Sequence, residues 1–201
     1  MTSILLVRHG HVAGIVPKRF RGRMDLPLSE EGQEQALRAA EFLATRYQPH
    51  AVYSSPLQRC RDSALALTSR QGMEAPTLVE GLTDTDYGQW QGRLATEVQQ
   101  QDPARYARWR EAPGAVTFPG GESLDGVAAR AITALDELAE RNVGSTIVVY
   151  SHDSVIRTVL LSAVSASLAA YHRLEIDPCS LSELRYGVAG TEVVRINERT
   201  G

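Results

Sequence analysis

The sequence predicts an α/β fold, a three-layer α/β/α sandwich with a mostly parallel central sheet. Two short runs of branched apolar residues, 4–7 and 147–150, suit strands that are buried on both faces. A third and shorter run, 51–53, ends in a Ser-Ser-Pro sequence that is typical of a turn into a helix. Segments with helical spacing of apolar residues lie between these runs, and strands that alternate with helices favour this layered architecture.

Helices are expected after each of the first two strands in the chain and before the run at 147–150. Ser29, followed by two glutamates, is typical of a capped helix start. Its apolar stripe is predicted to comprise Ala36, Leu37, Ala40, Leu43 and Tyr47. Ser55 and Pro56 indicate the start of the second helix. The third has apolar residues at i, i+3 and i+4 spacing, namely Leu124, Val127, Ala128, Ala131, Leu135 and Leu138.

The C-terminal part of the chain predicts a different element. Residues 181–196, broken at 187–190, are expected to form a hairpin of exposed strands. An unpaired edge there makes a homodimer plausible. Nothing in the composition indicates a second domain, so residues 1–201 are expected to form a single domain, with 76–121 as a lid or insertion over one edge of the sheet.

Composition limits the function classes. The 201 residues include 21 Lys and Arg against 24 Asp and Glu, a formal net charge of −3, which argues against a dedicated nucleic-acid binder. No apolar run approaches the ~18 residues of a membrane span, and the first residues do not form a signal-peptide core. Two cysteines, Cys60 and Cys179, lie far apart and outside any metal-ligand spacing. We therefore expect a cytoplasmic protein with neither nucleic acid nor membrane as a partner.

Polar residues follow the predicted strands, at the edge where α/β sheets bind ligands. The first strand is followed by Arg8, His9, Gly10 and His11. The strand at 147–150 is followed by Ser151, His152 and Asp153. Arg59 lies about one turn into the second helix. If these ends converge, two histidines and two arginines share one pocket.

These residue types together favour phosphoryl chemistry. Guanidinium groups match phosphate oxygens, and an imidazole is an accepted covalent nucleophile. Gly10 is expected to let a phosphate approach the backbone closely. Charge on the transferred group is then held by Arg8, Arg59 and a second histidine, and a carboxylic acid is needed to protonate the leaving alcohol. The pattern predicts a metal-independent hydrolase of a small phosphomonoester.

The residues around His9 also resemble a known family. Leu6-Val7-Arg8-His9-Gly10 is similar to the signature of the histidine phosphatase superfamily, which has the phosphoglycerate-mutase-like fold. Further blocks that resemble the family follow in the expected order, at 20–35, 53–59, 82–92, 118–123 and 149–152. One such block is weak support, but six in order, spread over most of the chain, are strong support.

The resemblance implies roles for individual residues. His9 becomes the phosphorylated nucleophile, and Arg8, Arg59 and His152 bind the phosphoryl group. The family's acid falls on Asp84, where glutamate is usual, so a shorter side chain has to reach the leaving oxygen. Asp153, directly after His152, resembles the acid of the acid-phosphatase branch and is the alternative proton donor. We favour Asp84 because the rest of the sequence is similar to the other branch. No metal and no cofactor are expected.

Two departures from the family concern substrate choice. The family often has Gly-Glu-Thr after the nucleophile and an asparagine a few residues later, whereas residues 10–12 are Gly-His-Val and Gly14 follows. One phosphate contact is thereby missing, and His11 and Arg21 become candidate substrate-binding residues together with Gly22. Arg21 stands where many members carry glutamine, which suggests a substrate with additional negative charge.

Three alternatives remain open at this point. A metal-dependent hydrolase would use His9, His11 and His152 as ligands, but this leaves the two arginines unexplained. A phosphoglycerate mutase would share the core but is usually longer. A module that binds a phosphorylated ligand without catalysis is the third. The basic run at 18–23 is either a solvated loop or a means of steering anions into the pocket.

Overall fold

The protein, described here as a computed structural model, contains a six-stranded sheet with the order β3-β2-β4-β1-β5-β6. The structure describes residues 1–13 and 15–200, so the departure noted at Gly14 lies outside the described residues. The strands are β1 (Thr2–Arg8), β2 (Ala51–Ser54), β3 (Thr77–Leu78), β4 (Thr146–Ser151), β5 (Leu181–Gly187) and β6 (Gly190–Glu198). The first four are mutually parallel, and β5 and β6 add antiparallel pairs at one side.

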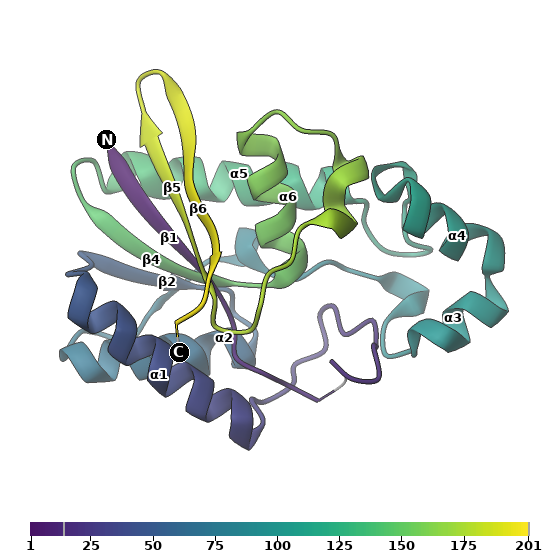
Figure 1. The fold of residues 1–201 in the computed structure, drawn as a ribbon, viewed down its shortest axis with the longest axis horizontal. Coiled ribbons are helices and arrows are strands. Elements are labelled where there is room, and N and C mark those ends of the chain that lie inside the picture. Colours follow the sequence, from purple (N-terminus) through teal and green to yellow (C-terminus); the bar gives the residue numbers. More distant parts are fainter. Residues whose placement is uncertain (14, 201) are drawn as a thin grey trace.

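Helices cover both faces of this sheet (Figure 1). Helices α1 (Glu30–Arg46) and α2 (Gln58–Gln71) pack on one face, and α5 (Leu124–Arg141) and α6 (Asp153–Ala163) pack on the other. Alternate residues of β1 point into the two layers, Leu5 toward α1 and α2, and Leu6 toward α5 and α6. A strand buried on both faces therefore has a continuous apolar sequence. The predicted three-layer fold is confirmed.

The helix predictions are confirmed in part. Ser29 caps α1 by accepting a hydrogen bond from the Gly32 amide at 3.1 Å, and every predicted apolar residue of α5 is buried. Leu37, however, is 62% exposed, and Ala39 is buried in its place. The core-facing stripe of α1 follows i, i+3 and i+4 steps from Ala36, and Leu37 lies about 100° away from that residue around the helix.

Two further local predictions were wrong. Helix α2 starts at Gln58 and not directly after Ser55, whose hydroxyl accepts from the Leu57 amide and contacts His152 instead. The C-terminal hairpin is not made of two exposed strands, because β5 pairs with β1 and its Leu181 is fully buried. Of the two hairpin strands, β6 lies at an edge of the sheet and β5 does not. The homodimer predicted from that edge stays a prediction.

Residues 76–121 lie mostly at one end of the sheet, beside the loop that follows β1 (Figure 1). Their helical elements are η1 (Glu80–Leu82), η2 (Gly88–Trp90), α3 (Ala95–Gln101), α4 (Pro103–Glu111) and η3 (Pro113–Ala115). An aromatic cluster anchors this region to Phe20 of the loop and to Tyr171 of η4 (Leu168–Arg173). Trp90 and Trp109 are buried in it as packing residues. Among the described residues, no helix has the length and apolar character needed to cross a membrane.

Candidate active site

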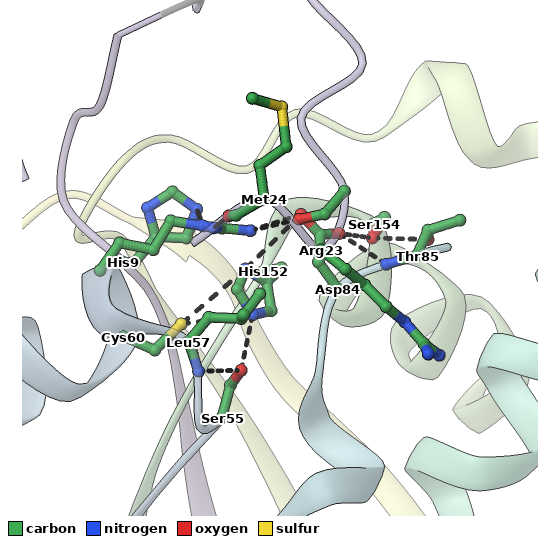
Figure 2. Close-up of polar contacts among 12 residues, drawn as sticks. His9, Arg23, Met24, Ser55, Leu57, Cys60, Asp84, Thr85, His152 and Ser154 are labelled. Atoms are coloured by element: carbon green, nitrogen blue, oxygen red, sulfur yellow. Dashed lines mark hydrogen bonds and ion pairs between the residues drawn. The ribbon is translucent and has the colours of Figure 1, made fainter. Parts of the chain in front are cut away.

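The carboxyl ends of three adjacent strands bring the candidate residues together. His9 follows β1, His152 follows β4, and Ser55 follows β2, and these strands are neighbours in the sheet. The rings of His9 and His152 meet edge to face, with centroids 5.3 Å apart and a 61° angle between their planes. Figure 2 shows the two rings in one cluster with Asp84. Residues that are far apart in the sequence thus form a compact site.

His9 is held in the state that a nucleophile needs. Its Nδ1 lies 2.7 Å from the carbonyl oxygen of Gly10, which can only accept, so Nδ1 carries the proton and Nε2 carries the lone pair. The Nε–H of Arg59 donates to this Nε2 at 3.2 Å. Burial, and then the positive charges of Arg59, His152 and Arg8, hold the pKa of His9 well below its ordinary value. The imidazole is therefore neutral at neutral pH.

Arg59 is a fully buried residue of α2, not a surface arginine. Its guanidinium donates to the carbonyl oxygens of Met24 at 2.7 Å and Gly22 at 2.8 Å, and it forms an ion pair with Asp84 at 3.0 Å. Gly22 has a φ of +49°, and a Cβ there would lie 2.6 Å from the carbonyl oxygen of Thr85. Glycine is thus required for this loop to approach Arg59.

Asp84 is held by two hydroxyl-bearing residues that the sequence analysis did not identify. Its Oδ1 accepts hydrogen bonds from the Thr85 amide at 2.8 Å and from the Ser154 hydroxyl at 2.5 Å, and Thr85 Oγ1 in turn donates to Ser154 at 2.9 Å (Figure 2). Its Oδ2 lies 3.0 Å from the Arg59 guanidinium and 3.6 Å from Nδ1 of His152. One carboxylate oxygen is therefore anchored and the other faces the histidines.

The loop that carries Asp84 is fixed from behind by an ion pair. Arg130 of α5 donates to the carbonyl oxygens of Gly81 at 2.9 Å and Asp84 at 3.2 Å. Glu122 binds Arg130 at 2.8 Å and accepts from the Asp86 amide at 2.7 Å. The sequence analysis quoted the block at 118–123 without assigning Glu122 a role. The feature of the sequence that could have pointed to Glu122 is its position directly before Ser123, the cap of a predicted helix.

His152 is buried against the base of α2. Its Nε2 lies 2.8 Å from the hydroxyl of Ser55 and 3.5 Å from Sγ of Cys60. Burial, followed by the charges of Arg59 and Arg130, places the pKa of His152 well below its usual value. Burial also raises the pKa of the Cys60 thiol strongly. Cys60 thus stays a protonated packing residue.

Gly10 and His11 have contacts that the sequence analysis did not predict. Gly10 is needed for packing on α1, because a Cβ there would lie 2.4 Å from the carbonyl oxygen of Gly32, and its amide donates to Ser63 at 3.1 Å. The ring of His11 lies 2.8 Å from the hydroxyl of Ser29 at the start of α1, and His11 does not line the cavity described next.

A cavity of about 190 Å³ opens beside this cluster. Its walls include Arg8, Arg21, Gly22, Asp84 and Asp153, together with Ile15, Lys18, Arg19, Phe20, Tyr87, Trp109, Ser154, Arg157 and Tyr171. Arg8 donates from Nη1 to the carbonyl oxygen of Ile176, while its buried Nε has no hydrogen-bond partner among the described residues. Such a buried donor is costly unless a ligand satisfies it, which marks Arg8 as an anion contact.

Asp153, the alternative acid, is differently placed. Its Oδ1 lies 2.7 Å from Nε of Arg157, one turn along α6, so its charge is paired at the cavity wall. Asp84 instead shares the buried cluster with Arg59 and His152. The structure thus gives the two candidate acids distinct surroundings.

The chain is similar in sequence and structure to known phosphatases. A family model for the histidine phosphatase superfamily (branch 1) matches residues 4–199. The chain belongs to this superfamily. Phosphoserine phosphatase 1 of Hydrogenobacter thermophilus is 31% identical over 197 residues, which cover 98% of this chain and 92% of that protein. A mycobacterial glucosyl-3-phosphoglycerate phosphatase structure is 26% identical, with a TM-score of 0.88 over 98% of both chains.

Other relatives of this chain are longer. A protein of Mycobacterium tuberculosis that is named bifunctional is 35% identical over 201 residues, which are all of this chain but 54% of that protein. The chain therefore spans about half the length of several curated relatives that it matches. The family and the phosphoglycerate-mutase-like fold predicted from the sequence are both confirmed.

Proposed function

We propose that this histidine phosphatase hydrolyses a small phosphorylated metabolite through a phosphohistidine at His9, without a metal ion. The observation that carries the proposal is the state of His9, whose unprotonated Nε2 faces a buried cluster of cations and an acid. Relatives named phosphoserine and glucosyl-3-phosphoglycerate phosphatases support phosphatase activity. The site residues have the roles that the resemblance implies.

In the first step, Nε2 of His9 attacks the phosphorus, the N–P bond forms and the bond from phosphorus to the alkoxide oxygen breaks. A phosphoryl group reaches Nε2 by taking over the hydrogen bond that Arg59 now makes there. Arg59, the unpartnered Nε–H of Arg8 and His152 then surround the phosphoryl oxygens. Fixed donors of this kind stabilise charge in the transition state without reorganising.

Asp84 is the proposed proton donor. In its protonated form Asp84 gives a proton from Oδ2, on the side of the histidines, to the leaving oxygen, and it then becomes the carboxylate that pairs with Arg59. In the second step Asp84 accepts a proton from water as the water oxygen attacks the phosphohistidine, which regenerates His9 and releases inorganic phosphate. The pairing of Asp153 with Arg157 supports Asp84 over Asp153 for this role.

Two observations favour metal-independent chemistry. Among the described residues, no three His, Cys, Asp or Glu side chains are grouped so that they could hold a metal ion. His11, which a metal site would need, contacts Ser29 instead. Arginines at the site, rather than a metal ion, hold the transferred charge in this proposal.

We also propose that residues 76–121 act as the lid predicted from the sequence. They contribute Asp84, Tyr87 and Trp109 to the cavity wall. The cavity of about 190 Å³ is smaller than the ~300–1,000 Å³ typical of drug-sized ligands, which supports a small metabolite as substrate. Two buried free thiols, Cys60 and Cys179, support a reducing compartment such as the cytoplasm.

The test is hydrolysis of p-nitrophenyl phosphate, with phosphate release measured as well as the phenol. The wild type and His9→Ala are compared with and without a chelator, and His50→Ala, which removes an exposed histidine, is the matched control. We expect turnover that survives chelation and His50→Ala and is lost in His9→Ala. Full turnover by His9→Ala would refute the phosphohistidine, and loss on chelation would refute metal independence. Phenol release without inorganic phosphate would indicate mutase-type transfer.

A further inference from the structure

The two ring nitrogens of His152 have different surroundings. Nδ1 lies on the side of Asp84, 3.6 Å from its Oδ2, and the proposed function places the transferred phosphoryl group on this side. Nε2 lies 2.8 Å from the hydroxyl of Ser55 and 3.5 Å from Sγ of Cys60. Figure 2 shows Ser55 and Asp84 on different sides of the ring. The nitrogen that carries the proton therefore decides what His152 can offer to a phosphate.

A neutral imidazole donates a hydrogen bond from one nitrogen only. Burial, followed by the charge of Arg59, lowers the pKa of His152, so the ring is neutral at neutral pH. Phosphoryl oxygens accept hydrogen bonds, so His152 can bind one from Nδ1 only when Nδ1 carries the proton. With the proton on Nε2, the lone pair of Nδ1 would face those oxygens and repel them. Binding of the transferred group thus requires the Nδ1–H tautomer.

Ser55 is placed to select this tautomer. Its hydroxyl oxygen accepts a hydrogen bond from the Leu57 amide at 3.3 Å, so its own proton can go to Nε2 of His152. The thiol of Cys60 directs its proton to the carbonyl oxygen of Ser151 at 3.4 Å, so it presents a sulfur lone pair to the ring. A hydroxyl that donates to Nε2 leaves the imidazole proton on Nδ1.

The hydroxyl of Ser55 and the ring of His152 are held rigidly relative to each other. The Ser55 amide donates to the carbonyl oxygen of Tyr150 at 2.9 Å, two residues before His152 in the chain. The hydroxyl of Ser54 donates to the carbonyl oxygen of Ser55 at 2.8 Å. Ser54, Ser55 and His152 are all fully buried. Neighbouring strands β2 and β4 therefore fix this contact before any substrate binds, as electrostatic catalysis requires.

We propose that Ser55 is a positioning residue, whose hydroxyl fixes His152 as an Nδ1–H donor toward the transferred phosphoryl group. This inference rests on the proposed function, because it assigns His152 to the phosphoryl oxygens. Ser55 does not touch the substrate and acts through the ring. Its hydroxyl serves the ring and does not cap α2, which begins at Gln58.

The first experiment locates the proton of His152 directly. Imidazole ¹⁵N NMR at neutral pH distinguishes the two tautomers, and His152→Asn assigns the signals. We expect the proton on Nδ1 in the wild type, and a substantial share of the Nε2–H tautomer in Ser55→Ala, because Sγ of Cys60 then remains beside Nε2 and can accept. Ser54→Ala, which removes an equally buried hydroxyl, is the matched control and should keep the wild-type tautomer. A wild type with the proton on Nε2, or an unchanged tautomer in Ser55→Ala, would overturn the proposal.

The second experiment measures kcat/KM. Removing one fixed donor to the transferred charge costs about 10²–10³-fold, and only part of the ring population loses it in Ser55→Ala, so we expect a loss of about tenfold to a hundredfold. p-Nitrophenyl phosphate and an alkyl phosphate should lose the same factor, because His152 holds the phosphoryl group and not the leaving oxygen. Ser54→Ala should stay within about twofold of the wild type.

A double variant separates positioning from a general structural effect. Added to His152→Asn, Ser55→Ala should change kcat/KM by about twofold or less, because its effect passes through the ring that is already absent. Comparable losses in the two backgrounds would show that Ser55 acts on the fold and not through His152, and would overturn the proposal.

Failure of the proposed function gives a different result. It would appear as absent turnover of p-nitrophenyl phosphate, or as turnover that persists in His9→Ala, and neither changes the tautomer measurement. Binding of inorganic phosphate, measured by calorimetry, tests Ser55 without turnover. We expect Ser55→Ala to weaken this binding by about tenfold and Ser54→Ala to leave it unchanged. Equal affinity in the wild type and Ser55→Ala, or binding by neither, would contradict the proposal.

Discussion

Replacing Asp84 by asparagine changes one oxygen of the site while keeping the side-chain shape. The retained Oδ1 can still accept from Thr85 and Ser154. The new amide takes the place of Oδ2, 3.0 Å from the Arg59 guanidinium and 3.6 Å from His152. The variant therefore removes the oxygen that gives and takes the proton, and with it the ion pair to Arg59, from the side of the cluster that faces the histidines.

The expected loss depends on the leaving group. General acid catalysis contributes about 10²–10⁴-fold, so an alkyl phosphate, whose alkoxide needs a proton, should lose activity in that range in Asp84→Asn. p-Nitrophenolate leaves without a proton, so kcat/KM for the aryl ester, which reports the steps up to phosphorylation of His9, should fall by about tenfold or less. The ratio of the two rates, rather than either rate alone, reports the proton donor.

Stability must be measured beside the rates. Arg59 is fully buried, and removing the partner of a buried ion pair costs about 3–5 kcal/mol. Thermal unfolding of Asp84→Asn should therefore occur at a lower temperature, and rates should be compared well below that transition. The matched control is Asp153→Asn, whose ion pair with Arg157 is partly exposed. We expect similar, small losses on both esters in this control.

Two outcomes would contradict the assignment of Asp84. Equal losses of kcat/KM on alkyl and aryl esters in Asp84→Asn would show a structural role and not proton donation. A selective loss on the alkyl ester in Asp153→Asn would move the proton donor to Asp153, as in the acid-phosphatase branch. Both measurements use the same phosphate-release assay, so the two variants are directly comparable.

Three further predictions test the surroundings of the site. Folding lowers the pKa of His9 and His152, so the folded state binds fewer protons than the unfolded state below pH ~6.5. The free energy of unfolding should therefore fall as the pH drops below that value. A urea midpoint that rises on acidification would contradict this. The acid limb of kcat/KM should also lie below pH ~6.5. Gly22→Ala should lower the free energy of unfolding by about 1–3 kcal/mol, because Gly22 has a positive φ and a Cβ there would contact Thr85. An unchanged urea midpoint would count against this strain. Ser154→Ala should lower kcat for alkyl esters by about tenfold while KM stays constant, as expected when Asp84 loses an anchoring hydrogen bond.

The sequence could predict the sheet and the convergence of His9 and His152, because both follow from residues that are adjacent in the chain. A buried parallel strand needs a continuous apolar run, and the residues directly after it lie at the ligand-binding edge. The same logic fails for a hairpin with mixed polarity, since only the pairing of β5 with β1 buries Leu181. It also fails for Leu37, where a one-residue difference in helix phase decides burial.

The contacts that anchor Asp84 could not be predicted from the sequence, because they join residues that are far apart in the chain. Ser154 is 70 residues from Asp84 in the chain, and the hydrogen bond between them depends on how α6 meets an irregular loop. Arg130 reaches the same loop from α5, through backbone carbonyls that leave no trace in the sequence. Hydroxyl groups and an arginine of a helix are common on surfaces, so their residue type alone does not mark them.

These contacts bear on the proposal that Asp84 is the proton donor, at a position where the resemblance implies glutamate. A shorter acid reaches the same oxygen only if its backbone lies closer to the reaction centre. Arg130 holds the carbonyl oxygens of Gly81 and Asp84, and Glu122 holds the following amide of Asp86, so the loop is fixed at three points of its main chain. Ser154 then fixes the carboxylate itself. Because these contacts together set the position of the Asp84 carboxylate, loosening the pair of Glu122 and Arg130 should impair proton transfer more than substrate binding.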